Sequence, residues 1–185
     1  MATSLVVVSI EEYERRSLAE PDRRWELHDG RMVEKPTMSM GHDLAQLELV
    51  RQLSAQLDVQ EYKVQFAARL RANDGRHFIP DVCVTPIALI EAAPDRRRLN
   101  VYTAPLPLVI EVWFLSTGGY DVDDKLPAYQ ARGDLEIWRL HPFERTLTVW
   151  RRRSDGSYLE QPIHDRTISP IAFPWVTIDL DAVLA

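Results

Sequence analysis

The chain has 185 residues, of which 45% are hydrophobic and 27% charged, and its formal net charge at pH 7 is -6. These values are typical of a water-soluble globular protein and exclude a disordered, low-complexity chain. The single cysteine, Cys83, excludes an intramolecular disulfide, and the acidic charge argues against a surface that coats nucleic acid on every side. We expect one domain over residues 1–185, located in the cytoplasm and without a membrane segment.

Asp-Gly pairs predict hairpin turns, because both residue types tolerate the positive φ that a tight turn requires. Asp29-Gly30 lies within a predicted hairpin over 25–36. Asp74-Gly75 separates two strand-like arms within 61–84, and the second arm carries Asp81. Near the end of the chain, strands are predicted over 135–141, 146–153 and 157–165, and Asp155-Gly156 joins the last two.

Two segments have the features of helices. In residues 41–57, apolar side chains recur at three- and four-residue spacing, which predicts an amphipathic helix that packs on a sheet through this face. Those side chains are Leu44, Leu47, Val50, Leu53 and Leu57. Residues 120–133 predict a second helix with Asp121 as N-cap and Gly133 as its stop, in which Pro127 is expected to disturb the second turn. The expected fold class is α/β or α+β, with a mixed sheet.

Two carboxylates interrupt apolar strands. Asp81 lies in "IPDVCVTP" (79–86), and Glu111 lies in "PLPLVIEVWF" (105–114), a run typical of a strand that is covered on both faces. A buried carboxylate is costly unless it is paired or bound to a cation, so a structural salt bridge is the simplest account of either one. The two together, with Lys125 nearby in the chain, instead indicate a divalent-metal hydrolase site.

Several segments, in order, resemble one bacterial domain family, the "putative restriction endonuclease" family of the PD-(D/E)XK nuclease superfamily. The resemblance extends from Ser9 to Leu184. It rests on "RRWELHDGRMVE", "MGHDLAQLELVRQL", "IPDVCV", "PLVIEVWFLSTGGYDVDDKLPAYQARGDLEIWRLHP" and "PWVTIDLDAVL". It implies a restriction-endonuclease-like core, in which a mixed central sheet is flanked by helices and carries extra hairpins.

The resemblance also implies site residues. Asp81 and Glu111 match the acidic positions of the family motifs and, with Val112, are the expected ligands of Mg²⁺ or Mn²⁺. Where the superfamily carries a lysine, this chain has Trp113, and the family takes its lysine from the next helix, in a motif matched by Asp121, Lys125 and Tyr129. Lys125 and Tyr129 are four residues apart and therefore share a helix face.

Two further residues match the family pattern less decisively. Glu26 lies in the hairpin and His42 near the start of the first predicted helix. The alternative for Glu26 is a solvated surface carboxylate, and the alternative for His42 is a capping or packing role. Glu48, on the predicted helix, is a second candidate for the acidic position of Glu26. The segment "FLST" and His141 depart from the family pattern near the expected site. The other histidines have no metal-ligand spacing, so surface or packing roles are expected for them.

These residues predict a metal-dependent DNA endonuclease. Compact nucleases of this kind often work as two-fold dimers, so a homodimer is expected, without a nucleotide cofactor. Arginine runs at 96–98 and 151–153 are candidate DNA contacts, although a solvated surface explains such runs equally well. The main alternative is a nuclease-like fold that binds nucleic acid or assembles with partners without catalysis. A glycosidase with paired carboxylates is disfavoured, because it does not require the strand-lysine-helix arrangement.

Overall fold

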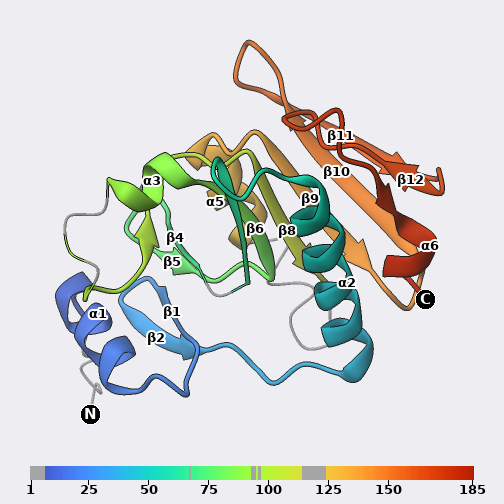
Figure 1. Ribbon diagram of the computed structural model, residues 1–185. Helices are drawn as coiled ribbons and strands as arrows, with labels where there is room; N and C mark the ends of the chain where they lie inside the picture. The colour runs from blue at the N-terminus through green and yellow to red at the C-terminus, as the bar shows by residue number, and fades with distance from the viewer. Residues whose placement is uncertain (1–6, 67, 93–94, 96, 114–123) are drawn as a thin grey trace.

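The structure, a computed structural model, describes residues 7–66, 68–92, 95, 97–113 and 124–185. Within these residues the strands form sheets of six, five and two strands, and helices flank them (Figure 1). The six-stranded sheet has the order β11-β10-β9-β8-β6-β3, and the five-stranded sheet has the order β2-β1-β5-β4-β7. Both sheets combine parallel and antiparallel pairs, so the predicted mixed sheet is confirmed.

The helices and strands follow one another along the chain in an irregular order. In the first half they are α1 (Ile10–Ala19), β1 (Trp25–His28), β2 (Arg31–Glu34), α2 (Met40–Gln56), β3 (Tyr62–Gln65), β4 (Arg69–Arg71), β5 (His77–Phe78), β6 (Val82–Pro86) and α3 (Ile87–Glu91). In the second half they are β7 (Val101–Tyr102), β8 (Leu108–Val112), α5 (Leu126–Arg132), β9 (Glu136–His141), β10 (Thr146–Arg152), β11 (Tyr158–Ile163), β12 (Thr167–Ile168), β13 (Ile178–Asp179) and α6 (Leu180–Val183).

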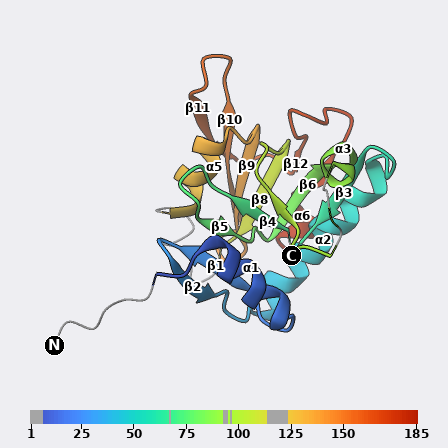
Figure 2. The ribbon, with the colours of Figure 1, turned by 90° about the vertical axis from the view of Figure 1, so that its left-hand side faces the viewer.

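The six-stranded sheet lies between two hydrophobic cores. On one face, Val82, Val84 and Ile110 pack with α2 and α6, and on the other face Cys83 and Val109 pack with α5 and the five-stranded sheet. Figure 2 shows α2 and α5 on opposite sides of the central strands. Every residue of β8 is buried, because alternate side chains enter different cores. This confirms the prediction that the strand is covered on both faces.

The helix predicted over 41–57 is confirmed as α2. Its predicted buried face is confirmed for Leu53 and Leu57, which are buried, and for Val50, which is half-buried, but it is wrong for Leu44 and Leu47. Leu44 and Leu47 have exposed fractions of 57% and 64%, whereas Ala45 and Leu49 are buried. The buried face also includes two polar residues, because each has a partner in the protein interior. His42 approaches Asp81, and Gln52 exchanges hydrogen bonds with the main chain of Asp179. The spacing of apolar residues does not predict the burial of these two polar side chains.

The turns at Asp29-Gly30, Asp74-Gly75 and Asp155-Gly156 are confirmed, and the glycine of each pair has a positive φ. The two arms predicted within 61–84 are interrupted, however. Strands β4 and β5 pair in the five-stranded sheet, whereas β3 and β6 pair in the six-stranded sheet. Asp81 therefore lies at the junction between two sheets instead of within an arm. Pro80 favours an interruption there, because it has no N–H to donate to a strand ladder.

Pro127 does not disturb the second predicted helix. Helix α5 begins at Leu126, so Pro127 lies in the first turn, where its missing N–H removes no intrahelical hydrogen bond. Gly133 ends the helix in the left-handed conformation, as predicted. The predicted N-cap, Asp121, lies outside the described residues. Among the residues that the structure describes, no helix is long and apolar enough to cross a membrane.

Candidate active site

Asp81 and Glu111 lie opposite each other at the end of the pair formed by β6 and β8. Val82 pairs with Ile110 in this antiparallel ladder, so Asp81, one residue before β6, is in register with Glu111. The main-chain N–H of Val112 donates a 2.7 Å hydrogen bond to Oδ2 of Asp81. Both carboxylates are buried, with side-chain exposed fractions of 3% and 5%. The strand pairing thus brings the two predicted acids together.

Asp81 is contacted by polar groups from three directions. Nζ of Lys35 lies 2.7 Å from Oδ1, and Nε2 of His42 lies 3.1 Å from Oδ2. Burial raises the pKa of the Asp81 carboxyl, but Lys35, His42 and Lys125 together lower it more, so this pKa lies well below its usual range. The Gln46 side chain donates to the main-chain oxygen of Asp81 and ties this residue to α2. Asp81 is therefore an ionised carboxylate with contacts to β8, to α2 and to Lys35.

Glu111 is contacted by side chains at the start of α5 and within it. The hydroxyl of Tyr129 donates a 2.7 Å hydrogen bond to Oε1 of Glu111. Nζ of Lys125 lies 3.3 Å from the same oxygen and 3.3 Å from Oε1 of Glu26. Lys125 immediately precedes α5, so the side chains of Lys125 and Tyr129 approach Glu111 together. The lysine ammonium therefore bridges two carboxylates from different sheets.

Glu26 enters the site from β1, whose hairpin belongs to the five-stranded sheet. Its Oε1 accepts a 2.8 Å hydrogen bond from the N–H of Ile79, and its Oε2 lies 3.1 Å from Nε2 of His28. Burial raises the pKa of Glu26, but Lys125, His28 and the other donors outweigh this effect and lower it to about 2. A third buried carboxylate therefore joins Asp81 and Glu111.

The residues predicted from the sequence are brought together by the fold. Asp81, Glu111, Lys125, Glu26, His42, Tyr129 and Val112 all belong to this one cluster. Glu48 does not belong to it, because its carboxylate is bound to Arg51 and Gln52 on α2. The sequence analysis missed Lys35 and assigned His28 a surface or packing role. The scarcity of lysine, with only three in the chain, is the one sequence signal that could have found Lys35.

Trp113, where the superfamily carries a lysine, takes part in an aromatic stack. Its ring lies 3.9 Å, between centroids, from the ring of His141, and the two planes are inclined by 19°. Phe143 meets both rings edge-on and is 60% exposed. This position therefore supplies no ammonium group, and Lys35 and Lys125 are the lysines in contact with the site carboxylates.

The sequence profile of the Uma2 family, described as "Putative restriction endonuclease", matches residues 10–181. The chain belongs to the Uma2 family. A crystal structure described as a "putative nuclease belonging to DUF820", from Anabaena variabilis, has a similar fold, with a TM-score of 0.71. The likeness has 16% sequence identity and covers 86% of this chain and 89% of that one. No curated protein matches the sequence. The restriction-endonuclease-like fold and the family resemblance inferred from the motifs are thereby confirmed.

In this Uma2 family member, the chemistry of the site suits a hard divalent cation. Mg²⁺ prefers carboxylate oxygens and usually takes one or two of them together with waters. Asp81 and Glu111 supply two such carboxylates on neighbouring strands, and Val112 contributes its N–H to Asp81. Within the described residues, no group of three or more His, Cys, Asp or Glu side chains forms a ready-made metal cage. The residues therefore fit a cation held by two carboxylates and completed by water.

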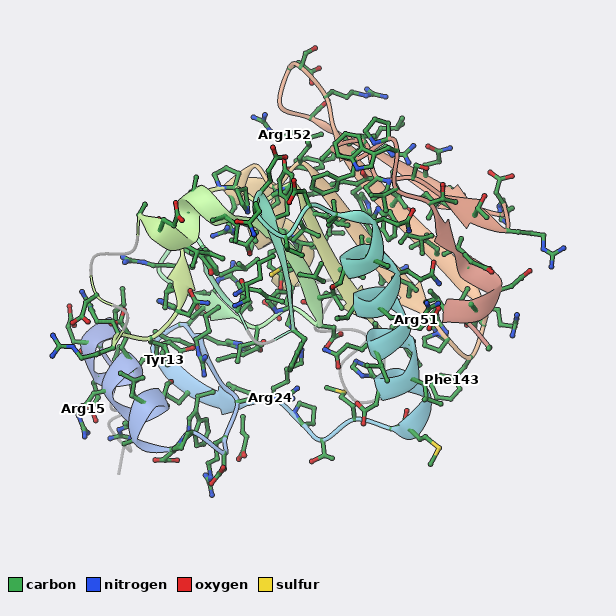
Figure 3. All side chains as sticks on the ribbon, viewed as in Figure 1. Tyr13, Arg15, Arg24, Arg51, Phe143 and Arg152 are labelled. Carbon is green, nitrogen blue, oxygen red and sulfur yellow. The ribbon has the colours of Figure 1, made fainter. Side chains whose placement is uncertain are left out.

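The two arginine runs of the Uma2 domain differ in their surroundings. Arg97 is paired with Asp95 and Arg98 with Glu14, so their positive charge is largely balanced. Arg151 is paired with the buried carboxylate of Glu136. Figure 3 shows Arg152 near the loop that joins β10 and β11, far from Arg15 on α1. Most of the described members of these runs thus have acidic neighbours, which weakens the runs as DNA contacts.

Proposed function

We propose that this protein is a metal-dependent endonuclease that hydrolyses phosphodiester bonds in DNA. Asp81 and Glu111 would hold Mg²⁺ or Mn²⁺, and Lys125 would assist the attacking water. The observation that carries the proposal is the pairing of these two buried carboxylates across β6 and β8, with an ammonium 3.3 Å from Glu111. Membership of a family described as "Putative restriction endonuclease" supports the same reaction class.

A bound divalent cation would supply Lewis-acid stabilisation of the charge that develops on the scissile phosphate. The residues of the chain would position the reacting groups around it. Lys125 would orient the water and stabilise negative charge, since its ammonium is held between Glu26 and Glu111. Tyr129 would fix the rotamer of Glu111 through its hydrogen bond. His42 and the Val112 N–H would fix Asp81 in the same way.

The test is cleavage of supercoiled and linear DNA in the presence of Mg²⁺ or Mn²⁺ by the wild type, Asp81→Ala and Glu111→Gln. We expect cleavage by the wild type that chelator abolishes, and a loss of at least about a hundred-fold in both variants. Lys63→Met is the matched control, because Lys63 is exposed on β3 at an edge of the sheet. Undiminished cleavage by Asp81→Ala would overturn the proposal.

A second candidate is a nuclease-like domain that binds nucleic acid without cleaving it. Trp113 in place of the superfamily lysine favours this reading, as do the protein donors that already surround Asp81. This candidate predicts DNA binding that is the same with Mg²⁺ and with chelator. Fluorescence anisotropy with labelled duplex and single-stranded DNA measures this binding, and a binding curve that collapses with chelator would contradict the second candidate. Metal-dependent cleavage in the assay above would favour the first.

The homodimer is also a proposal, since two-fold assembly would let two sites address two strands. An apolar stripe on α2, formed by Met40, Leu44 and Leu47, is exposed and is consistent with a self-association surface. Light scattering coupled to size-exclusion chromatography measures the mass directly. A monomer at all concentrations would contradict the proposed dimer and leave the proposed chemistry unaffected.

A further inference from the structure

Lys35 is a buried lysine. Its ammonium donates hydrogen bonds to two acceptors at the candidate site. It follows β2, and its main-chain N–H donates to the oxygen of Arg24, which continues the hairpin ladder. From this fixed backbone the side chain reaches across to the junction before β6. There Nζ donates 2.7 Å hydrogen bonds to the main-chain oxygen of Ile79 and to Oδ1 of Asp81. Its side chain is only 5% exposed.

The three polar groups around the Asp81 carboxylate differ in how readily they can move. The Val112 N–H belongs to the backbone of β8, so it cannot leave Oδ2 without disrupting the central sheet. His42 lies in the first turn of α2, where its ring is buried. Lys35 is held to Asp81 by a flexible four-carbon side chain with several rotatable bonds. Of the three contacts, the one at Oδ1 is the one that can be exchanged.

The charge balance of the site bears on how it could bind a cation. The site gathers three carboxylates, those of Glu26, Asp81 and Glu111, and two ammonium groups, those of Lys35 and Lys125. These groups leave one net negative charge, because three negative charges are opposed by two positive ones. A divalent cation at Asp81 would therefore adjoin an ammonium that already binds the same carboxylate. Two cations at one buried carboxylate repel each other strongly, because screening by water is weak there.

We propose that Lys35 is an internal counter-ion of Asp81 that competes with the divalent cation, so that metal binding displaces the Lys35 ammonium from Oδ1. This inference rests on the proposed function, since it concerns the same metal site. Without metal, Lys35 keeps the buried Asp81 carboxylate paired. With metal bound, the ammonium would leave Oδ1 and could donate a hydrogen bond to a phosphate oxygen of the substrate, which is also an anion. Lys35 thus lowers metal affinity in the absence of substrate.

The test measures Mn²⁺ binding by titration calorimetry at one fixed pH, without DNA, for the wild type, Lys35→Met, Lys35→Gln, Lys63→Met and Asp81→Ala. Methionine removes the charge but keeps most of the side-chain length, and glutamine keeps an N–H donor for Ile79 or Asp81. We expect both Lys35 variants to bind Mn²⁺ about ten-fold more tightly or better, since a charged hydrogen bond corresponds to about one to two powers of ten in an equilibrium constant. Lys63→Met should match the wild type, and Asp81→Ala should lose binding.

Thermal unfolding gives a second readout that does not depend on activity. Without metal, Lys35→Met should have a lower Tm than the wild type, because Asp81 loses a partner in a buried position. Saturating Mn²⁺ should raise the Tm of Lys35→Met more than that of the wild type. If Lys35→Met does not fold, Lys35→Gln carries the same comparison, because it retains a hydrogen-bond donor.

The outcomes separate the inference from the proposed function. Tighter Mn²⁺ binding in the Lys35 variants, lost in Asp81→Ala, supports both. Equal or weaker Mn²⁺ binding in the Lys35 variants, again lost in Asp81→Ala, overturns the competition and leaves the metal-dependent function standing. An absence of Mn²⁺ binding in every variant overturns both. Binding that survives in Asp81→Ala also overturns the competition, because the cation would then lie elsewhere.

Discussion

The hydroxyl of Tyr129, on α5, donates a 2.7 Å hydrogen bond to Oε1 of Glu111, on β8, within the buried site. Removing this donor leaves the carboxylate in place but loosens its orientation. We expect Tyr129→Phe to lower the cleavage rate or the metal affinity by about ten- to a hundred-fold, as for other groups that orient a metal ligand. Initial rates across a range of Mg²⁺ concentrations separate the two effects.

Tyr158→Phe is the matched control for that change. The Tyr158 hydroxyl also donates to a protein oxygen, that of Asp134, but it lies outside the carboxylate cluster. This variant should lose about 1 kcal/mol of stability and keep its cleavage rate. Equal rate losses in the two tyrosine variants would show that the Tyr129 effect reflects general loosening of the fold.

Lys125 is expected to be indispensable for both stability and activity. Its ammonium lies 3.3 Å from one oxygen each of Glu26 and Glu111, so Lys125→Met leaves two buried carboxylates without their shared cation. We expect a loss of about 3–5 kcal/mol in the free energy of unfolding without metal, and a rate loss of at least about a hundred-fold. Urea unfolding and cleavage assays measure the two effects.

Arginine should not replace this lysine. The planar guanidinium of Lys125→Arg keeps the charge but cannot present a single compact ammonium between two carboxylates. We expect this variant to recover stability in part and to remain poorly active. Wild-type cleavage by Lys125→Met would contradict the assigned role of Lys125 directly.

A second buried ion pair stabilises the fold away from the site. Arg132 and Asp134 are 3.0 Å apart, and the guanidinium also donates to main-chain oxygens of Tyr102 and Ala104. We expect Arg132→Met to cost about 3–5 kcal/mol, because an unpaired carboxylate stays buried. The double variant Arg132→Met/Asp134→Leu should lose less. Urea denaturation measures all three proteins, and a double variant no more stable than the single one would refute the pairing argument.

The buried His77 is expected to lower the free energy of unfolding in weak acid. Burial lowers the pKa of His77 to about 4 in the folded protein, from the value of 6.5 that a solvent-exposed histidine has. Between these values the unfolded chain takes up the proton and the folded chain does not, so the free energy of unfolding falls as the pH drops from 6.5 towards 4. Above pH 6.5 this contribution is fully present.

The change His77→Phe keeps a ring against Tyr13 and removes the titrating group. The difference in unfolding free energy between pH 7 and pH 5 should therefore become smaller in His77→Phe than in the wild type. His164→Gln, at an exposed position, should leave that difference unchanged. An identical pH dependence in wild type and His77→Phe would assign the acid sensitivity to other groups.

The sequence by itself determined the family, the mixed fold class and most of the candidate site. Asp-Gly pairs located the hairpin turns, because φ preference is a local property of the residues. The apolar run around Glu111 located a strand with two covered faces, and the motif order assembled Asp81, Lys125 and Tyr129. These features depend on residues that are near one another in the chain or belong to a known pattern.

Only the tertiary structure decided which polar side chains complete the site. Lys35 and Asp81 are 46 positions apart and meet because the hairpin of one sheet lies against the strand end of another. Part of the buried face of α2 was decided in the same way, since His42 and Gln52 are buried against distant partners, whereas Leu44 and Leu47 are exposed. Periodicity records which side chains are apolar, whereas burial of a charged or polar side chain depends on a partner that only the packing of distant segments supplies.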